Sequence, residues 1–187
     1  DVLAFTGSSA TGAKLRGNAN LVRQNVHVTL ECDSLNAAVL APDVEESSET
    51  YALFLRNVAL DMTQKTGQKC TAVRRIFVPK ERAAQVQADL VDALSRIPVG
   101  DPADEKMRMG PVASKAQFED VSKGIARLAA HGTVACGGAA RLYPKGWFLA
   151  PTLIVARDAA DPAHHAEEVF GPCASLLPYE GDASAAA

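Results

Sequence analysis

Short apolar runs of strand length alternate with longer amphipathic stretches along almost the whole chain. The runs VLAF, NVHVTLE, AAVL, VRRIFV and ASLLPY are typical of strands, and the stretches between them place apolar residues at helical spacing. A strand that is followed by a helix and then by another strand favours parallel pairing, with the helices packed on the faces of the sheet. The sequence therefore predicts an α/β fold built on doubly wound parallel sheets.

The expected elements can be placed by their end signals. A strand at 2–5, a helix at 9–16 and a strand at 25–31 form half of a βαβ unit. A helix with apolar residues from Tyr51 to Met62 should be capped by Asp43 or Ser47 and ended by Gly67. Further helices are expected at 81–97 and 114–132, and strands at 133–138, within WFLAPTLIV as a strand pair, and at 174–179. The Ala-rich tail at 183–187 is expected to be frayed.

Composition excludes several classes of partner. The 187 residues carry a net charge of -3 with both signs spread along the chain, so no basic stripe suited to nucleic acid or to an anionic membrane surface is present. No window reaches the roughly 18 apolar residues that a membrane span needs, and the N-terminus does not resemble a secretory signal. We expect a cytoplasmic protein that binds neither nucleic acid nor membrane.

The four cysteines are scattered and form no CxxC pair, so their spacing suggests neither a zinc site nor a disulfide framework. They are Cys32, Cys70, Cys136 and Cys173, and we expect reduced thiols. The first residue is Asp1, and the apolar run directly after it already reads as a buried strand. We therefore expect the chain to start inside a domain, as a fragment of a longer protein would.

Cys70 is the candidate nucleophile. It lies in the sequence GQKC between an expected helix and an expected strand, where Gly67 lets the backbone turn sharply and present the thiol together with its own amide. The alternative is a small buried hydrophobic residue, which is the common fate of a free cysteine. The neighbouring Lys69 could lower the thiol pKa or could point to solvent, and the residues alone leave both open.

Glu31 is the candidate general base, because it ends the alternating apolar strand VHVTLE, where a carboxylate is awkward to bury without a task or a partner. Strand ends in open α/β sheets are where ligands bind. The alternative is a solvated carboxylate at the top of the sheet.

Two other segments suit a cofactor. The turn FTGSSATG sets Gly7 and Ser8 between a strand and a helix, so its free amides could receive a phosphate or a ribose, although any strand-to-helix turn needs glycine. In HHAEEVFGP, Glu168 and Phe170 are two apart, so in an extended segment they share one side and could hold a ribose and cover a planar ring. The adjacent His164 and His165 favour a solvated polar turn over a metal site, and we predict no metal.

Four segments in this order, FTGSSATG, VTLE, GQKC and EEVFGP, resemble the signature series of the aldehyde dehydrogenase superfamily. The resemblance extends over essentially the whole chain and includes GWFLAPTL. It implies part of the three-layer fold of that family: residues 1–34 as the last part of the NAD(P)-binding domain, and residues 35–187 as most of the thiol-bearing catalytic domain.

The resemblance also implies roles for the candidate residues. Cys70 would attack the aldehyde carbon to give a thiohemiacetal and then a thioester, with its own amide in the oxyanion hole. Glu31 would deprotonate the water that releases a carboxylic acid. Glu168 would bind the nicotinamide ribose, Phe170 would pack beside the ring, and Gly7 and Ser8 would line the cofactor cleft.

One departure narrows the resemblance. Most of the family continues its catalytic glutamate with Leu-Gly-Gly, whereas Glu31 is followed by Cys32, Asp33 and Ser34. This variant, with KTGQKCTAVRR and VGDPADEKMRMGP, is similar to a subgroup that oxidises CoA-bound semialdehydes in the degradation of aromatic compounds through benzoyl-CoA or phenylacetate. The subgroup favours NADP over NAD, although the residues that would decide between them are expected upstream.

The resemblance further implies that an oxyanion-hole asparagine and an adenosine-binding lysine precede this chain, so we expect the chain alone to bind dinucleotide poorly and to turn over little. The parent would be a homo-oligomer acting on a small aldehyde. Two alternatives stay open: a CoA-acylating enzyme, against which Glu31 argues, and a non-catalytic assembly or interaction module. The reactivity of the Cys70 thiol would distinguish a catalytic protein from the non-catalytic module.

Overall fold

A computed structural model describes residues 1–182, so the expectation for the tail at 183–187 lies outside the described residues. The chain divides between Ser34 and Leu35 into two compact units. Each is described by itself below. The assignment of these units to a cofactor-binding domain and a thiol-bearing domain stays a prediction.

The first unit is a two-stranded parallel sheet with two helices. Its strands are β1 (Val2–Gly7) and β2 (His27–Cys32), and its helices are α1 (Ser9–Arg16) and α2 (Ala19–Arg23). Exposure alternates along both strands, and a Cβ atom at Gly12 of α1 would lie 2.7 Å from Sγ of Cys32. The absence of a side chain at Gly12 thus lets α1 pack closely on one face of the sheet, and this confirms the βα start read from the sequence.

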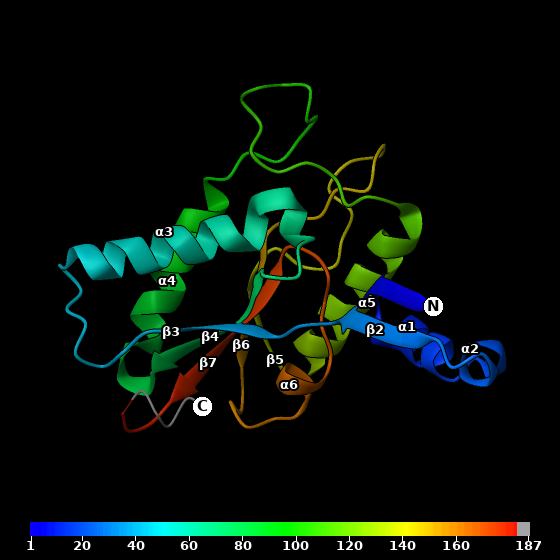
Figure 1. The fold of residues 1–187 in the computed structure, drawn as a ribbon. Helices are drawn as coiled ribbons and strands as arrows, with labels where there is room; N and C mark the ends of the chain where they lie inside the picture. The colour runs from blue at the N-terminus through cyan, green and yellow to red at the C-terminus, as the bar shows by residue number, and fades with distance from the viewer. Residues whose placement is uncertain (183–187) are drawn as a thin grey trace. The chain divides into compact units, whose positions relative to one another are not determined.

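The second unit is built on a five-stranded sheet in the order β3-β4-β7-β6-β5, drawn in Figure 1. Its strands are β3 (Asn36–Val39), β4 (Val73–Pro79), β5 (Gly132–Cys136), β6 (Thr152–Ala156) and β7 (Cys173–Tyr179). Its helices are α3 (Glu49–Thr63), α4 (Ala83–Ser95), α5 (Lys115–Ala130) and α6 (Ala163–Ala166), with short 3-10 turns η1 (Gln64–Gly67) and η2 (Lys80–Arg82).

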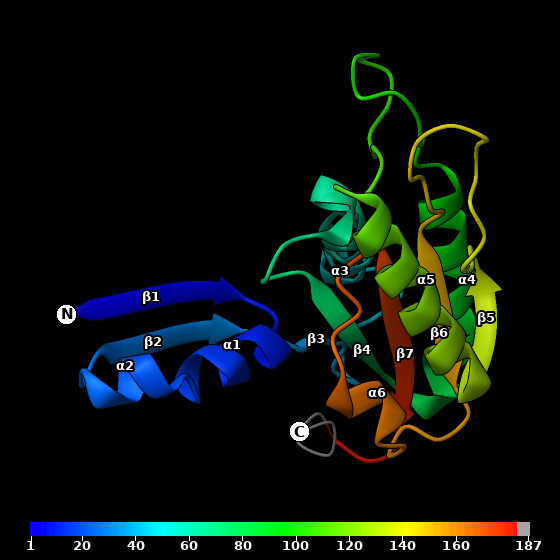
Figure 2. The ribbon, with the colours of Figure 1, turned by 90° about the vertical axis from the view of Figure 1, so that its right-hand side faces the viewer.

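Helices cover both faces of this sheet. Leu153 and Leu176 pack with buried residues of α3 and α4, whereas Ile154 and Cys173 pack with buried residues of α5. Successive residues of a strand point to opposite faces, so α3 and α4 lie on one face and α5 on the other. Figure 2 shows α5 in front of the sheet with α4 behind it. The α/β fold with helices on both faces, predicted from the sequence, is confirmed.

Three local expectations are wrong. The cap of α3 is Ser48, whose side chain accepts a hydrogen bond from the amide of Tyr51, and not Asp43 or Ser47. WFLAPTLIV holds one strand, β6, which starts after Pro151. The sheet is not wholly parallel, because β5 pairs antiparallel with β6. Gly137 and Gly138 follow β5 with positive φ angles, and residues 137–151 contain no helix that would cross over the sheet, so the chain returns as an antiparallel neighbour.

Candidate functional site

Cys70 is exposed and lies in a tight turn between η1 and β4. The amide of Ala72 donates to the carbonyl of Lys69 at 3.1 Å, which closes the turn around Cys70. Asn36, the first residue of β3, donates from its side chain to the carbonyls of Cys70 at 2.6 Å and Ala72 at 3.1 Å. We call residues 68–72 the Cys70 turn. Its exposure sets aside the alternative that Cys70 is a buried hydrophobic residue.

The chain reaches this turn through three consecutive residues with positive φ. Lys65, Thr66 and Gly67 have φ angles of 53°, 58° and 67°. The first two are a rare conformation for residues with a side chain, and the buried Thr66 is held by its hydroxyl, which donates to the carbonyl of Gly110 at 3.1 Å. Thus α3 ends at Thr63, and Gly67 ends the 3-10 turn that follows it, four residues later than the helix itself.

Gln68 connects the Cys70 turn to the segment that contains Glu168 and Phe170. Its side-chain nitrogen donates to the carbonyl of Phe170 at 3.2 Å and to the side chain of Gln117 on α5. Its side-chain oxygen accepts from the amide of Ala113 at 2.9 Å. Two motifs that are about a hundred residues apart in the sequence therefore lie side by side, as a common site requires.

Arg74, the second residue of β4, makes the same connection, and sequence reasoning missed it. Its guanidinium donates to the carbonyls of Gly67 at 2.7 Å and Gly171 at 2.8 Å. Its Nε and Nη2 atoms lie 3.3 and 3.2 Å from Oε1 of Glu168. The only signal in the sequence was an arginine pair inside the apolar run VRRIFV, where a buried charge needs a partner.

The Arg74–Glu168 ion pair is withdrawn from water, since the two side chains are 3% and 6% exposed. Burial lowers the pKa of Arg74 from its usual value, and the charge of Glu168 opposes that shift. Phe170 stands partly exposed beside the pair, with the guanidinium carbon of Arg74 5.6 Å from its ring centre. Glu168 and Phe170 thus both lie beside Arg74, and their roles toward a ribose and a planar ring stay a prediction.

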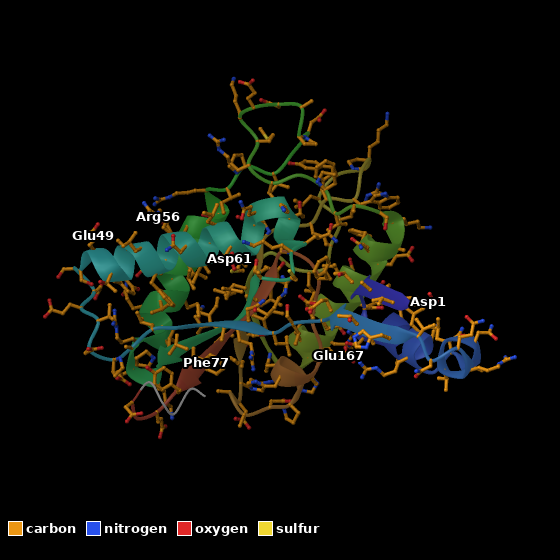
Figure 3. The ribbon with its side chains drawn as sticks, in the orientation of Figure 1. Asp1, Glu49, Arg56, Asp61, Phe77 and Glu167 are labelled. Atoms are coloured by element: carbon orange, nitrogen blue, oxygen red, sulfur yellow. The ribbon has the colours of Figure 1, made fainter. Side chains whose placement is uncertain are left out.

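Lys69 does not simply point to solvent. Its ammonium pairs with the carboxylate of Asp61 and donates to the side chain of Gln64 at 3.1 Å. The second oxygen of Asp61 accepts from the amide of Val73 at 2.6 Å. Asp61, labelled in Figure 3, lies near the end of α3. Its carboxylate therefore links that helix to Lys69 in the Cys70 turn and to Val73, the residue directly after the turn.

A pocket of about 350 Å³ lies next to Asp61, between α3 and the strands β3 and β4. Its wall is mostly apolar, with Phe54, Leu60 and Val73 contributing, and Asp61 and Gln64 add polar atoms. Cys70 is not among the lining residues.

The other predicted residues lie in the first unit. Thr6 and Glu31 are partners in the parallel pairing of β1 and β2, and both are exposed at the carboxyl ends of the strands. Gly7 and Ser8 follow directly, and Ser8 caps α1 by accepting from the amide of Thr11 at 3.4 Å. Glu31, Gly7 and Ser8 are therefore gathered at one end of this small sheet, where ligands bind in open α/β folds.

His164 differs from expectation. His164 is 2% exposed, and its Nδ1 atom lies 2.9 Å from the hydroxyl of Ser175, so the prediction of a solvated polar turn is wrong for it. The reason is that the short helix α6 turns its His164 side chain onto β7, which the sequence of a polar segment does not indicate. Residues 1–182 contain no group of three or more metal-ligating side chains, and none of their helices is long and apolar enough to cross a membrane.

A family model of the aldehyde dehydrogenase family matches residues 1–187. A 3,4-dehydroadipyl-CoA semialdehyde dehydrogenase from Aromatoleum evansii is 38% identical over 96% of the chain, which covers 36% of that relative. The chloroplastic betaine aldehyde dehydrogenase of Atriplex hortensis is 33% identical over 98% of the chain and is likewise covered for 36% of its length. The chain thus spans little more than a third of these curated relatives.

Solved structures agree in fold. A mutant of aldehyde dehydrogenase C from Pseudomonas syringae, in complex with NAD+ and octanal, matches with a TM-score of 0.86 at 29% identity, over 97% of this chain and 36% of that one. An aldehyde dehydrogenase of Mycobacterium tuberculosis, in complex with NAD+, matches with a TM-score of 0.81 at 28% identity, with the same coverage.

Proposed function

The chain belongs to the aldehyde dehydrogenase family, and from this premise we propose that the protein containing it oxidises an aldehyde to a carboxylic acid with a nicotinamide cofactor. One observation supports this most strongly. Arg74 and Gln68 hold the turn that exposes Cys70 against the segment that carries Glu168 and Phe170. A nucleophilic thiol and a candidate ribose-binding carboxylate therefore belong to one rigid arrangement.

Cys70 is the proposed nucleophile. Its sulfur attacks the carbonyl carbon of the aldehyde, the carbon–oxygen double bond opens, and a thiohemiacetal forms whose oxygen carries the negative charge. Backbone amides in a tight turn are the groups that stabilise such an oxyanion. The bound nicotinamide supplies the hydride acceptor that allows this adduct to become a thioester. The closed turn and the Asn36 hydrogen bond support this role by fixing the backbone on both sides of the thiol.

Glu31 is the proposed general base. Its carboxylate takes a proton from water, the resulting hydroxide adds to the thioester carbon, and the thiolate of Cys70 leaves with a carboxylic acid as product. Its exposed position at the carboxyl end of β2, beside Thr6, supports this role because it leaves the carboxylate open to water.

The residues present fit a nicotinamide cofactor. The carboxylate of Glu168 is oriented by Arg74 and could accept hydrogen bonds from ribose hydroxyls, and the accessible ring of Phe170 suits contact with a planar ring. Gly7 and Ser8, at the start of α1, would line the cleft for the remainder of the dinucleotide. NAD+ is bound in two of the similar structures, and we propose NADP as the preferred cofactor on the subgroup resemblance alone.

We propose a CoA-linked semialdehyde as the substrate class. The 38% identity to a 3,4-dehydroadipyl-CoA semialdehyde dehydrogenase supports this, as do the residues after Glu31 that depart from the usual Leu-Gly-Gly. The pathway would then be the breakdown of an aromatic compound. We also propose that the full-length protein is a homo-oligomer.

The test uses the full-length protein, that is, the longer polypeptide that we expect to contain this chain. An aliphatic acyl-CoA semialdehyde is offered with NADP+ and with NAD+, and the product is identified by mass. We expect free acid from the unaltered protein, no turnover from Cys70→Ala, and a covalent thioester on Cys70 in Glu31→Gln. Full activity of Cys70→Ala, or no oxidation of any aldehyde, would contradict the proposal. With free CoA also supplied, a second CoA thioester at the former aldehyde carbon would instead support the CoA-acylating alternative.

A further inference from the structure

Arg74 is an unusual residue to find in the interior of this unit. It is 4% exposed and lies in a strand whose neighbours Ile76 and Val78 belong to the apolar core. Burying a charged guanidinium is costly unless each of its donors finds an acceptor and its charge finds a counterion. Its retention in a buried strand therefore needs a structural or a functional reason.

The acceptors of Arg74 come from both halves of the proposed site. Gly67 and Lys69 belong to the approach to Cys70 and accept at 2.7 and 3.4 Å, while Gly171 follows Phe170 and accepts at 2.8 Å. The remaining bonds, from Nε and Nη2, both end on Oε1 of Glu168. A planar guanidinium is rigid, so these bonds tie the carboxylate to the backbone that presents the thiol.

We infer that Arg74 is a positioning residue for the cofactor: it fixes the carboxylate of Glu168, in register with the Cys70 turn, in the orientation that binds the nicotinamide ribose. The inference rests on the proposed function, because it assumes that Glu168 meets that ribose. Arg74 acts through Glu168 and through the backbone, and it contacts neither the cofactor nor the aldehyde.

Arg75, the next residue, is the natural comparison. It is also an arginine of β4, but it points to the opposite face, where its Nε donates to the carbonyl of Leu35 at 3.1 Å and its Nη1 lies 3.2 Å from Nδ1 of His165. Arg75 is therefore held by Leu35 and His165 on that face, and it provides a matched control of the same size and charge.

The test measures the dissociation constant of NADP+ and NAD+ for the full-length protein by fluorescence titration. We expect Arg74→Lys to weaken binding on the order of tenfold, because a lysine keeps the charge but cannot form the planar fork to Glu168 and two carbonyls. Arg75→Lys should change the constant less than about twofold. Unfolding temperatures confirm that each variant is folded, and Arg74→Gln replaces Arg74→Lys if the latter shows no cooperative unfolding.

A double-mutant cycle separates positioning from general destabilisation. If Arg74 acts through Glu168, then Arg74→Lys should change the dissociation constant less than about twofold when it is introduced into Glu168→Ala. Two independent, multiplying effects in the cycle, or unchanged binding in Arg74→Lys, would overturn the inference and leave the proposed function intact. Failure of the unaltered protein to bind either dinucleotide would overturn the proposed function, and this inference with it.

Discussion

The carbonyl oxygen of Gly171 occupies the space that a side chain at Gly67 would need. A Cβ atom built at Gly67 would lie 2.3 Å from that oxygen and 2.8 Å from the carbonyl oxygen of Met62. The backbone before Cys70 and the backbone after Phe170 are therefore in direct contact, and the buried Arg74 donates to the carbonyls of both glycines. Close backbone approach, together with the carbonyl acceptors, brings the two motifs of the site together.

Gly67→Ala should lower the free energy of unfolding by about 3 kcal/mol or more, because the new methyl group overlaps backbone atoms and φ at this position is +67°. Displacement of the Cys70 turn should also change the rate of alkylation of Cys70. Urea unfolding and iodoacetamide labelling measure the two effects. Gly138→Ala is the matched control, since φ there is +122° but no atom lies within 4 Å of the new Cβ. Equal losses from both variants would show that backbone conformation alone, and not the contact with Gly171, is responsible.

Asp61→Ala should loosen the Cys70 turn. The change removes the ion pair to Lys69 and the acceptor of the Val73 amide, and we expect a loss of about 1–2 kcal/mol with faster hydrogen exchange at Val73. Asp61→Asn keeps an acceptor for that amide and should lose less. As a control, Glu180→Gln breaks an ion pair on the surface, to Lys80, and should leave exchange at Val73 unchanged. Unaltered hydrogen exchange at Val73 in Asp61→Ala would argue against a role of Asp61 in holding the Cys70 turn.

His164 should make the protein less stable in mild acid. Burial, the main cause, lowers the pKa of His164 below its usual 6.5, and the charge of Asp161 opposes this only in part. The unfolded chain then binds a proton more readily than the folded one, so stability falls as pH decreases from about 6.5 toward the folded pKa, by about 1.4 kcal/mol for each pKa unit of lowering.

Unfolding by urea at pH 7.5 and at several lower values would measure this effect, with His164→Gln as the comparison. The variant can still bond Ser175 but has no group that titrates, so its stability should fall less over the same range. Titration of Asp161 does not overlap with that of His164. A hydrogen bond from the Ala163 amide, and next a hydrogen bond with the His131 side chain, lower the pKa of Asp161 from 3.8, so the stability that depends on Asp161 is lost at lower pH. Identical pH dependence in both proteins would show that His164 is not responsible.

Asp33 occupies a strained backbone position with φ of +25°, at the place where the family usually has the first glycine after its catalytic glutamate and leucine. Asparagine and aspartate tolerate positive φ better than other residues with side chains. Asp33→Ala should therefore destabilise the protein by about 1 kcal/mol, whereas Asp33→Gly should be neutral or slightly stabilising. Thermal unfolding would measure both, and greater stability of Asp33→Ala than of Asp33→Gly would contradict this explanation.

Most elements of the fold follow from local patterns in the sequence. An apolar run indicated β1, alternating apolar residues indicated β2, and α1 was predicted at its observed bounds, because strand and helix periods differ and their end signals lie within a few residues. The sequence predicted Ser47 as a possible cap of α3, one residue before the observed cap Ser48. Both serines offer the same hydroxyl, and only the backbone path selects between them. The strand β5 was predicted, but its antiparallel direction was not, because strand polarity depends on where the chain returns and not on composition.

The sequence by itself determined which residue types are available for chemistry: a thiol at Cys70 after a glycine turn, a carboxylate at Glu31 at the end of a strand, and the pair Glu168 and Phe170. Only the tertiary structure decided that Arg74 joins Glu168 to the Cys70 turn, that Asp61 fastens the same turn, and that His164 is buried against Ser175. The physical reason is distance along the chain. Residue 74 lies in β4 and residue 168 precedes β7, the neighbour of β4 in the sheet, so their contact depends on long-range strand pairing that no local pattern records.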